Sequence, residues 1–135
     1  MPPQDGVLRL IKDMEEHREY SCIGGLYFTK GEGGCAQIWG DPKDPLPNFR
    51  PQVPIPETIQ ECCGTGMGFN LWRIEMFKDE RIPKPWFKTL DGSDGKGVGT
   101  QDLTFWGEAR KYGYRCAIDT GVRVGHFDQA TGVCW

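Results

Sequence analysis

The sequence predicts one α/β domain, residues 1–135, in which helices flank a mixed sheet. A chain of 135 residues is long enough to bury one hydrophobic core. Segments of helical periodicity alternate with short β-prone runs, which is typical of an α/β architecture. The helical segments are residues 7–15, 71–77 and 102–111, and the β-prone runs are residues 22–28, 35–39, 62–69 and 116–124.

The first helix is predicted after Pro2 and Pro3, which fit an extended lead or a first helical turn. Its apolar residues form one stripe that needs a sheet to cover: Val7, Leu8, Leu10, Ile11 and Met14. Residues 22–28 and 35–39 are then predicted to be strands joined by a hairpin loop over residues 29–34. The N-terminal third therefore predicts a helix packed on the start of a sheet.

Residues 41–56 are predicted to be a connector without regular structure. Proline lacks the N–H that helices and strands need. This segment contains Pro42, Pro45, Pro47, Pro51, Pro54 and Pro56.

Residues 62–69 are predicted to be a strand broken by Gly64, Gly66 and Gly68, and residues 71–77 a helix. Glycines inside a strand often mark close approach by a ligand or by another backbone. The alternative is tight packing against the loop around Trp86. The run DGSDGKGVG, residues 91–99, has the composition of a loop.

Residues 99–126 carry the most functional information. Leu103, Phe105, Trp106 and Ala109 recur at helical spacing, and Gly113 lies where a C-terminal cap is expected. Cys116, Ile118, Val122 and Val124 alternate as in a half-buried strand, interrupted by a turn-prone Asp119-Thr120-Gly121. Because open α/β sheets bind ligands where their strands end, this layout can hold Asp102 and His126 over one cleft.

Composition excludes several classes of protein. The net charge of −3 and a pI near 5.4 argue against nucleic-acid binding, which needs clustered cations. No apolar run approaches the ~20 residues that span a bilayer, and no signal segment is recognised, so we expect a cytoplasmic protein without a transmembrane segment. The six cysteines lack the paired spacing of a zinc site or a disulfide framework, which favours reduced core thiols.

Several short motifs resemble the C-terminal half of GT-A glycosyltransferases of the inverting, family-two type. Gln101-Asp102, Gly113-Tyr114 and Val124-Gly125-His126 follow in the order and spacing of that family. The run CCGTGMGFNLWRIEMF, residues 62–77, is similar to its glycine-rich strand and following helix, and Pro85-Trp86-Phe87 resembles its acceptor-side loop. SCIGGLYFTKGEGGCAQIW, residues 21–39, is similar to its strand and hairpin, so the resemblance covers nearly the whole chain.

The resemblance implies a partial GT-A fold whose N-terminal nucleotide-binding half is missing. The family binds the donor diphosphate through a metal held by an Asp-x-Asp motif, and no Asp-x-Asp occurs in this sequence. A divalent ion, Mn²⁺ or Mg²⁺, is therefore expected to bind this chain weakly. We also expect either a missing N-terminal half or a homo-oligomer, because a truncated sheet exposes strand edges and apolar surface.

Asp102 is the candidate catalytic base, since inverting sugar transfer needs a group that accepts the proton of the acceptor hydroxyl. The alternative is a carboxylate that only caps the helix N-terminus. His126 is the candidate metal ligand, with a capping or surface histidine as its alternative.

Five further residues are assigned to ligand binding. Gly64 and Gly66 are candidates for the nucleotide or cofactor, and Trp86, Gln101 and Phe105 for the substrate. Trp86 offers an aromatic face suited to a sugar ring, although it would serve equally well as a core residue.

The sequence thus predicts transfer of a sugar from a nucleotide-diphospho-sugar to an unidentified acceptor hydroxyl, with inversion, by a chain that is incomplete alone. One alternative is a non-catalytic, self-associating interaction module. The other is a small zinc-binding module built from cysteine and histidine.

Overall fold

The computed structural model describes residues 1–29, 34–44, 48–93 and 98–134 of the chain. Its elements, in chain order, are α1 (Gly6–Glu16), β1 (Cys22–Leu26), β2 (Phe28–Thr29), β3 (Cys35–Ala36), β4 (Ile38–Trp39), β5 (Ile59–Cys62), β6 (Gly64–Thr65), β7 (Asn70–Trp72), α2 (Glu75–Lys78), β8 (Leu90–Asp91), β9 (Val98–Gly99), α3 (Gln101–Ala109), a 3-10 turn η1 (Arg110–Tyr112), β10 (Cys116–Arg123), β11 (Phe127–Asp128) and β12 (Val133–Cys134).

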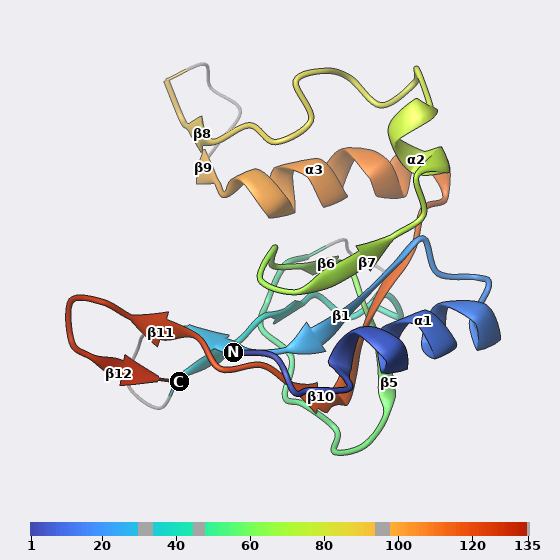
Figure 1. The fold of residues 1–135 in the computed structure, drawn as a ribbon. Helices are drawn as coiled ribbons and strands as arrows, with labels where there is room; N and C mark the ends of the chain where they lie inside the picture. Colours follow the sequence, from blue (N-terminus) through green and yellow to red (C-terminus); the bar gives the residue numbers. More distant parts are fainter. Residues whose placement is uncertain (30–33, 45–47, 94–97, 135) are drawn as a thin grey trace.

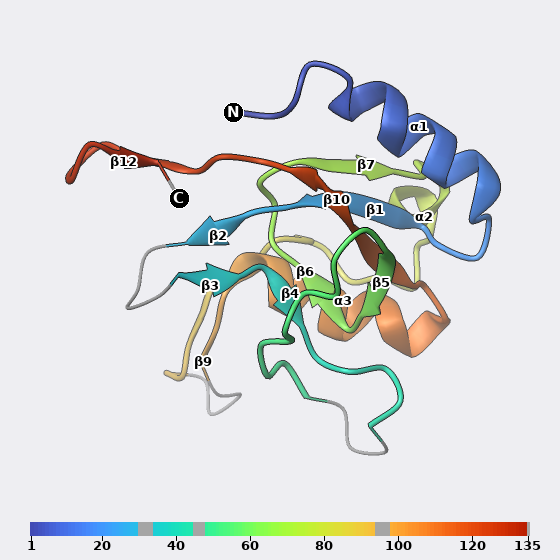
Figure 2. The same cartoon turned by 90° about the horizontal axis from the view of Figure 1, so that it is seen from below.

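A four-stranded mixed sheet forms the middle layer, in the order β5-β10-β1-β7. The two central strands, β1 and β10, run parallel, and the outer strands β5 and β7 are antiparallel to them. Helix α1 covers one face of the sheet and α3 the other (Figures 1 and 2). The predicted α/β class with a mixed sheet between helices is confirmed.

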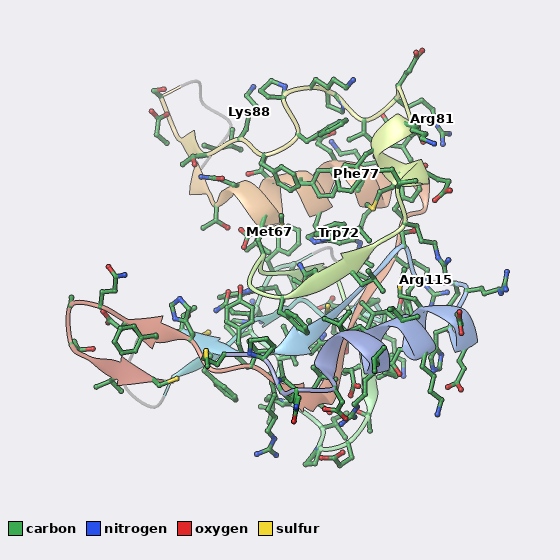
Figure 3. All side chains as sticks on the ribbon, in the orientation of Figure 1. Met67, Trp72, Phe77, Arg81, Lys88 and Arg115 are labelled. Carbon is green, nitrogen blue, oxygen red and sulfur yellow. The ribbon has the colours of Figure 1, made fainter. Side chains whose placement is uncertain are left out.

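The α3 face of the sheet carries the larger core, which is rich in aromatic side chains. Trp72 stacks on Trp106 with ring centroids 5.4 Å apart, and Phe77 stacks on Phe105 at 5.5 Å. Figure 3 shows Trp72 between the sheet and α3, and Phe77 at the level of the helix. Burial of four such rings fixes α3 against the sheet, because large aromatic side chains contribute most of the apolar area in a core.

Three sequence expectations need correction. The helix predicted over residues 71–77 is shorter: residues 70–72 form edge strand β7, and α2 spans only Glu75–Lys78. Strand β10 is continuous and buried on both faces because it lies in the middle of the sheet. Its turn-prone residues appear as an irregularity in the pairing with β1, where the register jumps from Asp119 to Arg123.

The third correction concerns the apolar stripe of α1. Leu10 and Met14 pack on the sheet, whereas Val7, Leu8 and Ile11 are 55%, 70% and 41% exposed. The helix therefore uses only part of its apolar surface in this fold. No helix in the described part of the chain is long and apolar enough to cross a bilayer.

A charged contact joins α1 to β10. Arg9 donates a hydrogen bond to the buried Asp119 carboxylate at 3.2 Å, and Asp13 lies beside the same carboxylate. Burial, followed by the negative charge of Asp119, raises the pKa of Asp13 to about 6. Asp13 therefore keeps its proton, next to the Asp119 carboxylate, up to about pH 6.

We expect this contact to make stability depend on pH. The folded-state pKa of Asp13, about 6, lies above the ordinary value of 3.8 for this carboxyl group, so its contribution is complete below about pH 4 and is lost as the pH rises through about 6. Because the side chain is partly solvated, the loss should be on the order of 1 kcal/mol. Urea unfolding at several pH values measures it. Asp13→Asn should remove this part of the pH dependence, and an unchanged profile in that variant would contradict the assignment.

Candidate active site at the carboxyl ends of β1 and β10

The two parallel strands end at the same side of the sheet, and a functional side chain follows each. Tyr27 comes directly after β1, and His126 comes three residues after the end of β10. Their ring centroids are 6.0 Å apart and the rings are tilted by 46°. Tyr27 is buried and His126 is exposed, so the imidazole lies at the surface above the phenol ring. Carboxyl ends of parallel strands are where open α/β sheets bind ligands.

The turn between β6 and β7 packs directly on Tyr27. The N–H of Gly68 donates a hydrogen bond to the Tyr27 hydroxyl at 3.1 Å. A Cβ atom at Gly66 would lie 2.2 Å from that hydroxyl, and one at Gly68 would lie 2.6 Å from the ring. Only glycine fits at these two positions. The side chain of Met67, between them, is 47% exposed and is labelled in Figure 3.

Asp102 lies in the first turn of α3. It is the second residue of the helix and is half-buried. One carboxylate oxygen, Oδ1, accepts hydrogen bonds from the Leu103 N–H at 2.9 Å and from the Thr100 hydroxyl. The Asp102 side chain therefore does contact the helix N-terminus, as its alternative interpretation predicts. Within the described residues Oδ2 has no hydrogen-bond partner, and this leaves one oxygen for chemistry.

Electrostatics connect Asp102 with Tyr27. Burial raises the pKa of the Tyr27 hydroxyl, the Gly68 N–H lowers it, and the negative charge of Asp102 raises it. A carboxylate, a neutral phenol and an imidazole thus gather at one end of the central strands. Such a group can accept a proton at the carboxylate and bind polar atoms at the imidazole.

Gly64 and Gly66, assigned to a cofactor by sequence, are both buried. A Cβ atom at Gly64 would lie 3.0 Å from Leu103 and 3.3 Å from Trp106 on α3, and the space beside Gly66 is filled by Tyr27. The close approach at these glycines is therefore to α3 and to Tyr27. It is neither to the Trp86 loop nor to an open space in which a cofactor would fit.

The three residues assigned to the substrate are separated. Phe105 is 1% exposed in the aromatic core, where it reaches no ligand. Gln101 is exposed and lines a groove of ≈ 460 Å³ together with Thr89, Leu90, Gly99, Thr100 and Leu103. Trp86 is half-buried: its ring contacts Phe77 at 5.1 Å, and the Lys84 ammonium lies over it at 5.0 Å. The groove at Gln101 and the cavity at Trp86 share Leu90, so they adjoin.

His126 is the candidate metal ligand. Within the described residues there is no group of three or more His, Cys, Asp or Glu side chains that could hold a metal ion. Divalent ions need several ligands, so the described residues do not by themselves form a complete metal centre. This holds for Mn²⁺ or Mg²⁺ and equally for the zinc alternative.

Sequence reasoning missed two residues of the site. Tyr27 was included in a predicted strand without a role, although a polar aromatic residue at the end of a buried strand is a usable signal. Asn70 donates to the Gly66 carbonyl at 2.8 Å and holds the turn against Tyr27. This hydrogen bond spans only four residues, but its role follows from the packing of the turn on Tyr27, which a local pattern does not reveal.

Comparisons with known proteins support the fold alone. No protein-family model matches the sequence, and no curated protein matches it. Among solved structures, the chain is similar to the crystal structure of A197 from STIV, with a TM-score of 0.60 and 17% sequence identity. The match covers 96% of this chain and 53% of that one, so the chain spans about half the length of A197.

Proposed function

We propose that this chain is the acceptor-side and catalytic-base half of an inverting GT-A-type glycosyltransferase. It would act on a nucleoside-diphosphate sugar and an acceptor hydroxyl, together with a nucleotide-binding half. The main support is that His126 lies with its ring 6.0 Å from that of Tyr27, at the carboxyl ends of the parallel strands, and that the charge of Asp102, distant in sequence, acts on the same tyrosine. The mixed α/β architecture is compatible with the GT-A part of the proposal.

In this reaction Asp102 accepts the proton of the acceptor hydroxyl through its free Oδ2. The acceptor oxygen forms a bond to the anomeric carbon of the sugar, and the bond from that carbon to the diphosphate breaks. The nucleoside diphosphate leaves with the electron pair, so the configuration inverts. Thr100 and the Leu103 N–H fix Oδ1 and thereby orient Oδ2. A base held in position typically contributes ~10²–10⁴ to the rate.

We propose His126 as a ligand of a weakly bound Mn²⁺ or Mg²⁺ ion. When bound, such an ion would neutralise charge on the donor diphosphate. His126 is exposed and its ring is supported on one side by Tyr27, which leaves nitrogen atoms accessible. We assign no reaction step to the ion, because the described residues supply no further cluster of ligands.

Calorimetry with Mn²⁺ and a nucleoside-diphosphate sugar tests this site. We expect residues 1–135 to bind weakly, and His126→Ala to weaken binding further because one metal–imidazole bond is lost. His17→Ala is the matched control, since His17 lies at the end of α1. Equal binding by His126→Ala and the parent chain would remove His126 from the site, and tight binding by the parent would argue against a missing half.

Self-association is a second proposal, supported by the exposed apolar side chains of α1. Val7, Leu8 and Ile11 together leave a continuous part of the helix uncovered, and such surfaces often mark protein interfaces. A self-associating module would sediment as a dimer or larger species without nucleotide or metal. A clean monomer at high micromolar concentration would exclude it.

A further inference from the structure

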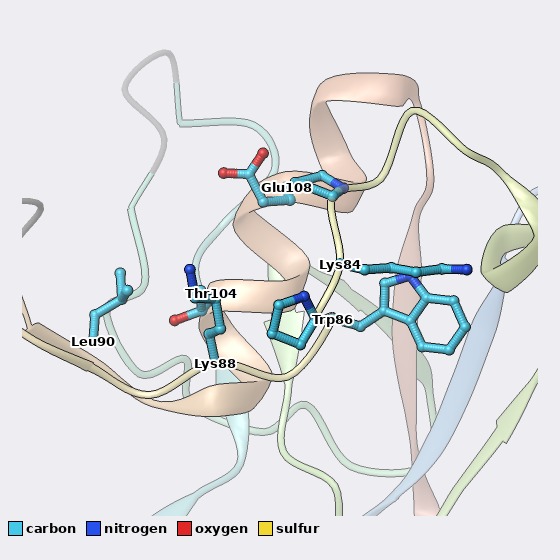
Figure 4. Close-up of a pocket in the computed structure, with 8 residues that line it drawn as sticks. Lys84, Trp86, Lys88, Leu90, Thr104 and Glu108 are labelled. Carbon is cyan, nitrogen blue, oxygen red and sulfur yellow. The ribbon is translucent and has the colours of Figure 1, made fainter.

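A second cavity, separate from the Tyr27 site, lies between residues 83–90 and the outer face of α3. Its volume is ≈ 210 Å³, and its lining residues are Pro83, Lys84, Pro85, Trp86, Lys88, Leu90, Thr104 and Glu108. Thr104 and Glu108 are four residues apart, so they lie on one face of the helix. Figure 4 shows Lys84 extending alongside the Trp86 indole and Lys88 extending towards Thr104. The lining therefore combines the apolar rings of prolines and Trp86 with the charged side chains of two lysines and Glu108.

The charge of this cavity is positive. Among the residues that the structure describes, neither Lys84 nor Lys88 has a carboxylate partner. The acidic residue of the wall, Glu108, is already paired with Lys111 at 2.7 Å. On a chain with a net charge of −3, these two lysines thus have no carboxylate partner, and their side chains extend in opposite directions (Figure 4).

A hydrogen-bond donor of the wall also lacks a partner. The indole nitrogen Nε1 of Trp86 is buried, and no acceptor within the described residues contacts it. Buried polar groups in native proteins nearly always have a partner, so an unpaired donor indicates a water or a ligand atom. The Lys84 ammonium, which lies beside this indole, and the indole N–H are both donors. Their common complement is an acceptor that carries negative charge.

We propose that this cavity binds the anionic group, phosphate or carboxylate, of a small hydroxylated ring compound. Lys84 and the neighbouring Trp86 N–H would hold the anion, and Pro85 would contact the ring. The volume suits one small molecule, because cavities for larger, drug-sized ligands are ≈ 300–1,000 Å³. The cavity adjoins the groove at Gln101. That this ligand is the sugar acceptor rests on the proposed function, whereas the binding itself does not.

The test follows the indole N–H resonance of Trp86 in NMR spectra of the whole chain, identified by its absence in Trp86→Phe. Glucose 6-phosphate, glucuronate and uncharged glucose are titrated separately. We expect at least one of the two anions to shift this resonance, more weakly as sodium chloride is raised, and glucose to have little effect. A stronger response to glucose 6-phosphate would assign the anion as phosphate, and one to glucuronate as carboxylate.

Lysine variants complete the test. Lys84→Gln should weaken binding about tenfold, because a charge-assisted contact is lost, whereas Lys88→Gln should weaken it less, because Lys88 extends away from the indole. Lys12→Gln is the matched control: it removes the same charge from exposed α1, on the other face of the sheet. The proposal fails if neither anion shifts the Trp86 resonance, if glucose binds equally well, or if Lys12→Gln weakens binding as much. None of these outcomes requires turnover, so they do not depend on whether the chain is a transferase.

Discussion

Asp102→Asn is expected to lower turnover by ~10²–10⁴ while leaving donor binding nearly unchanged. Asparagine retains the size of the side chain and an oxygen that can accept the Leu103 N–H. It does not retain a basic oxygen in place of Oδ2. The change therefore removes proton acceptance and preserves the helix start. The measurement is kcat in a protein in which residues 1–135 follow a nucleotide-binding half.

The control for this prediction is Asp5→Asn, the same chemical change at the start of α1 on the other face of the sheet. It should leave kcat unchanged. If Asp102→Asn retains full kcat and only lowers the melting temperature, then Asp102 is a helix-capping residue. Its hydrogen bonds to Leu103 and Thr100 would then account for everything that it does.

The elements best predicted from sequence were those with strong local signals. Helix α3 followed from periodic apolar residues, and Gly113, with φ 85°, caps the 3-10 turn η1 that continues it. Strand β10 was found for a similar reason. The short edge strand β7 was assigned to a helix because Leu71, Trp72 and Phe77 suit either structure. Only its pairing with β1 decides between them, and that contact is not local.

The candidate site was likewise predictable only where the sequence signal was local. Asp102 and His126 could be proposed from short motifs and from their places at the ends of elements. Tyr27, which contacts the ring of His126 and senses the charge of Asp102, could not. The buried glycines were associated with close approach by a ligand or a backbone or with packing on the Trp86 loop, whereas the atoms that approach them belong to other side chains. The group that approaches was missed, because Tyr27 lies about forty residues earlier in the chain.

Among the three residues assigned to the substrate, Phe105 is the one most deeply buried in the core. Its ring is 1% exposed and lies 4.8 Å from Phe87, 5.5 Å from Phe77 and 5.7 Å from Trp106, measured between centroids. A side chain surrounded in this way has no face left for a sugar. Its contribution should therefore be to stability, since removing a buried aromatic ring loses apolar burial and leaves a cavity.

Phe105→Ala is accordingly expected to lower the free energy of unfolding by about 3–5 kcal/mol, measured by urea denaturation. Phe127→Ala, at a phenylalanine that is 58% exposed on β11, is the matched control and should cost far less. Phe105→Leu should recover part of the loss because it refills much of the cavity. A destabilisation below about 1 kcal/mol in Phe105→Ala would mean that the α3 core is loosely packed around this ring, and a ligand-facing role for Phe105 would then regain support.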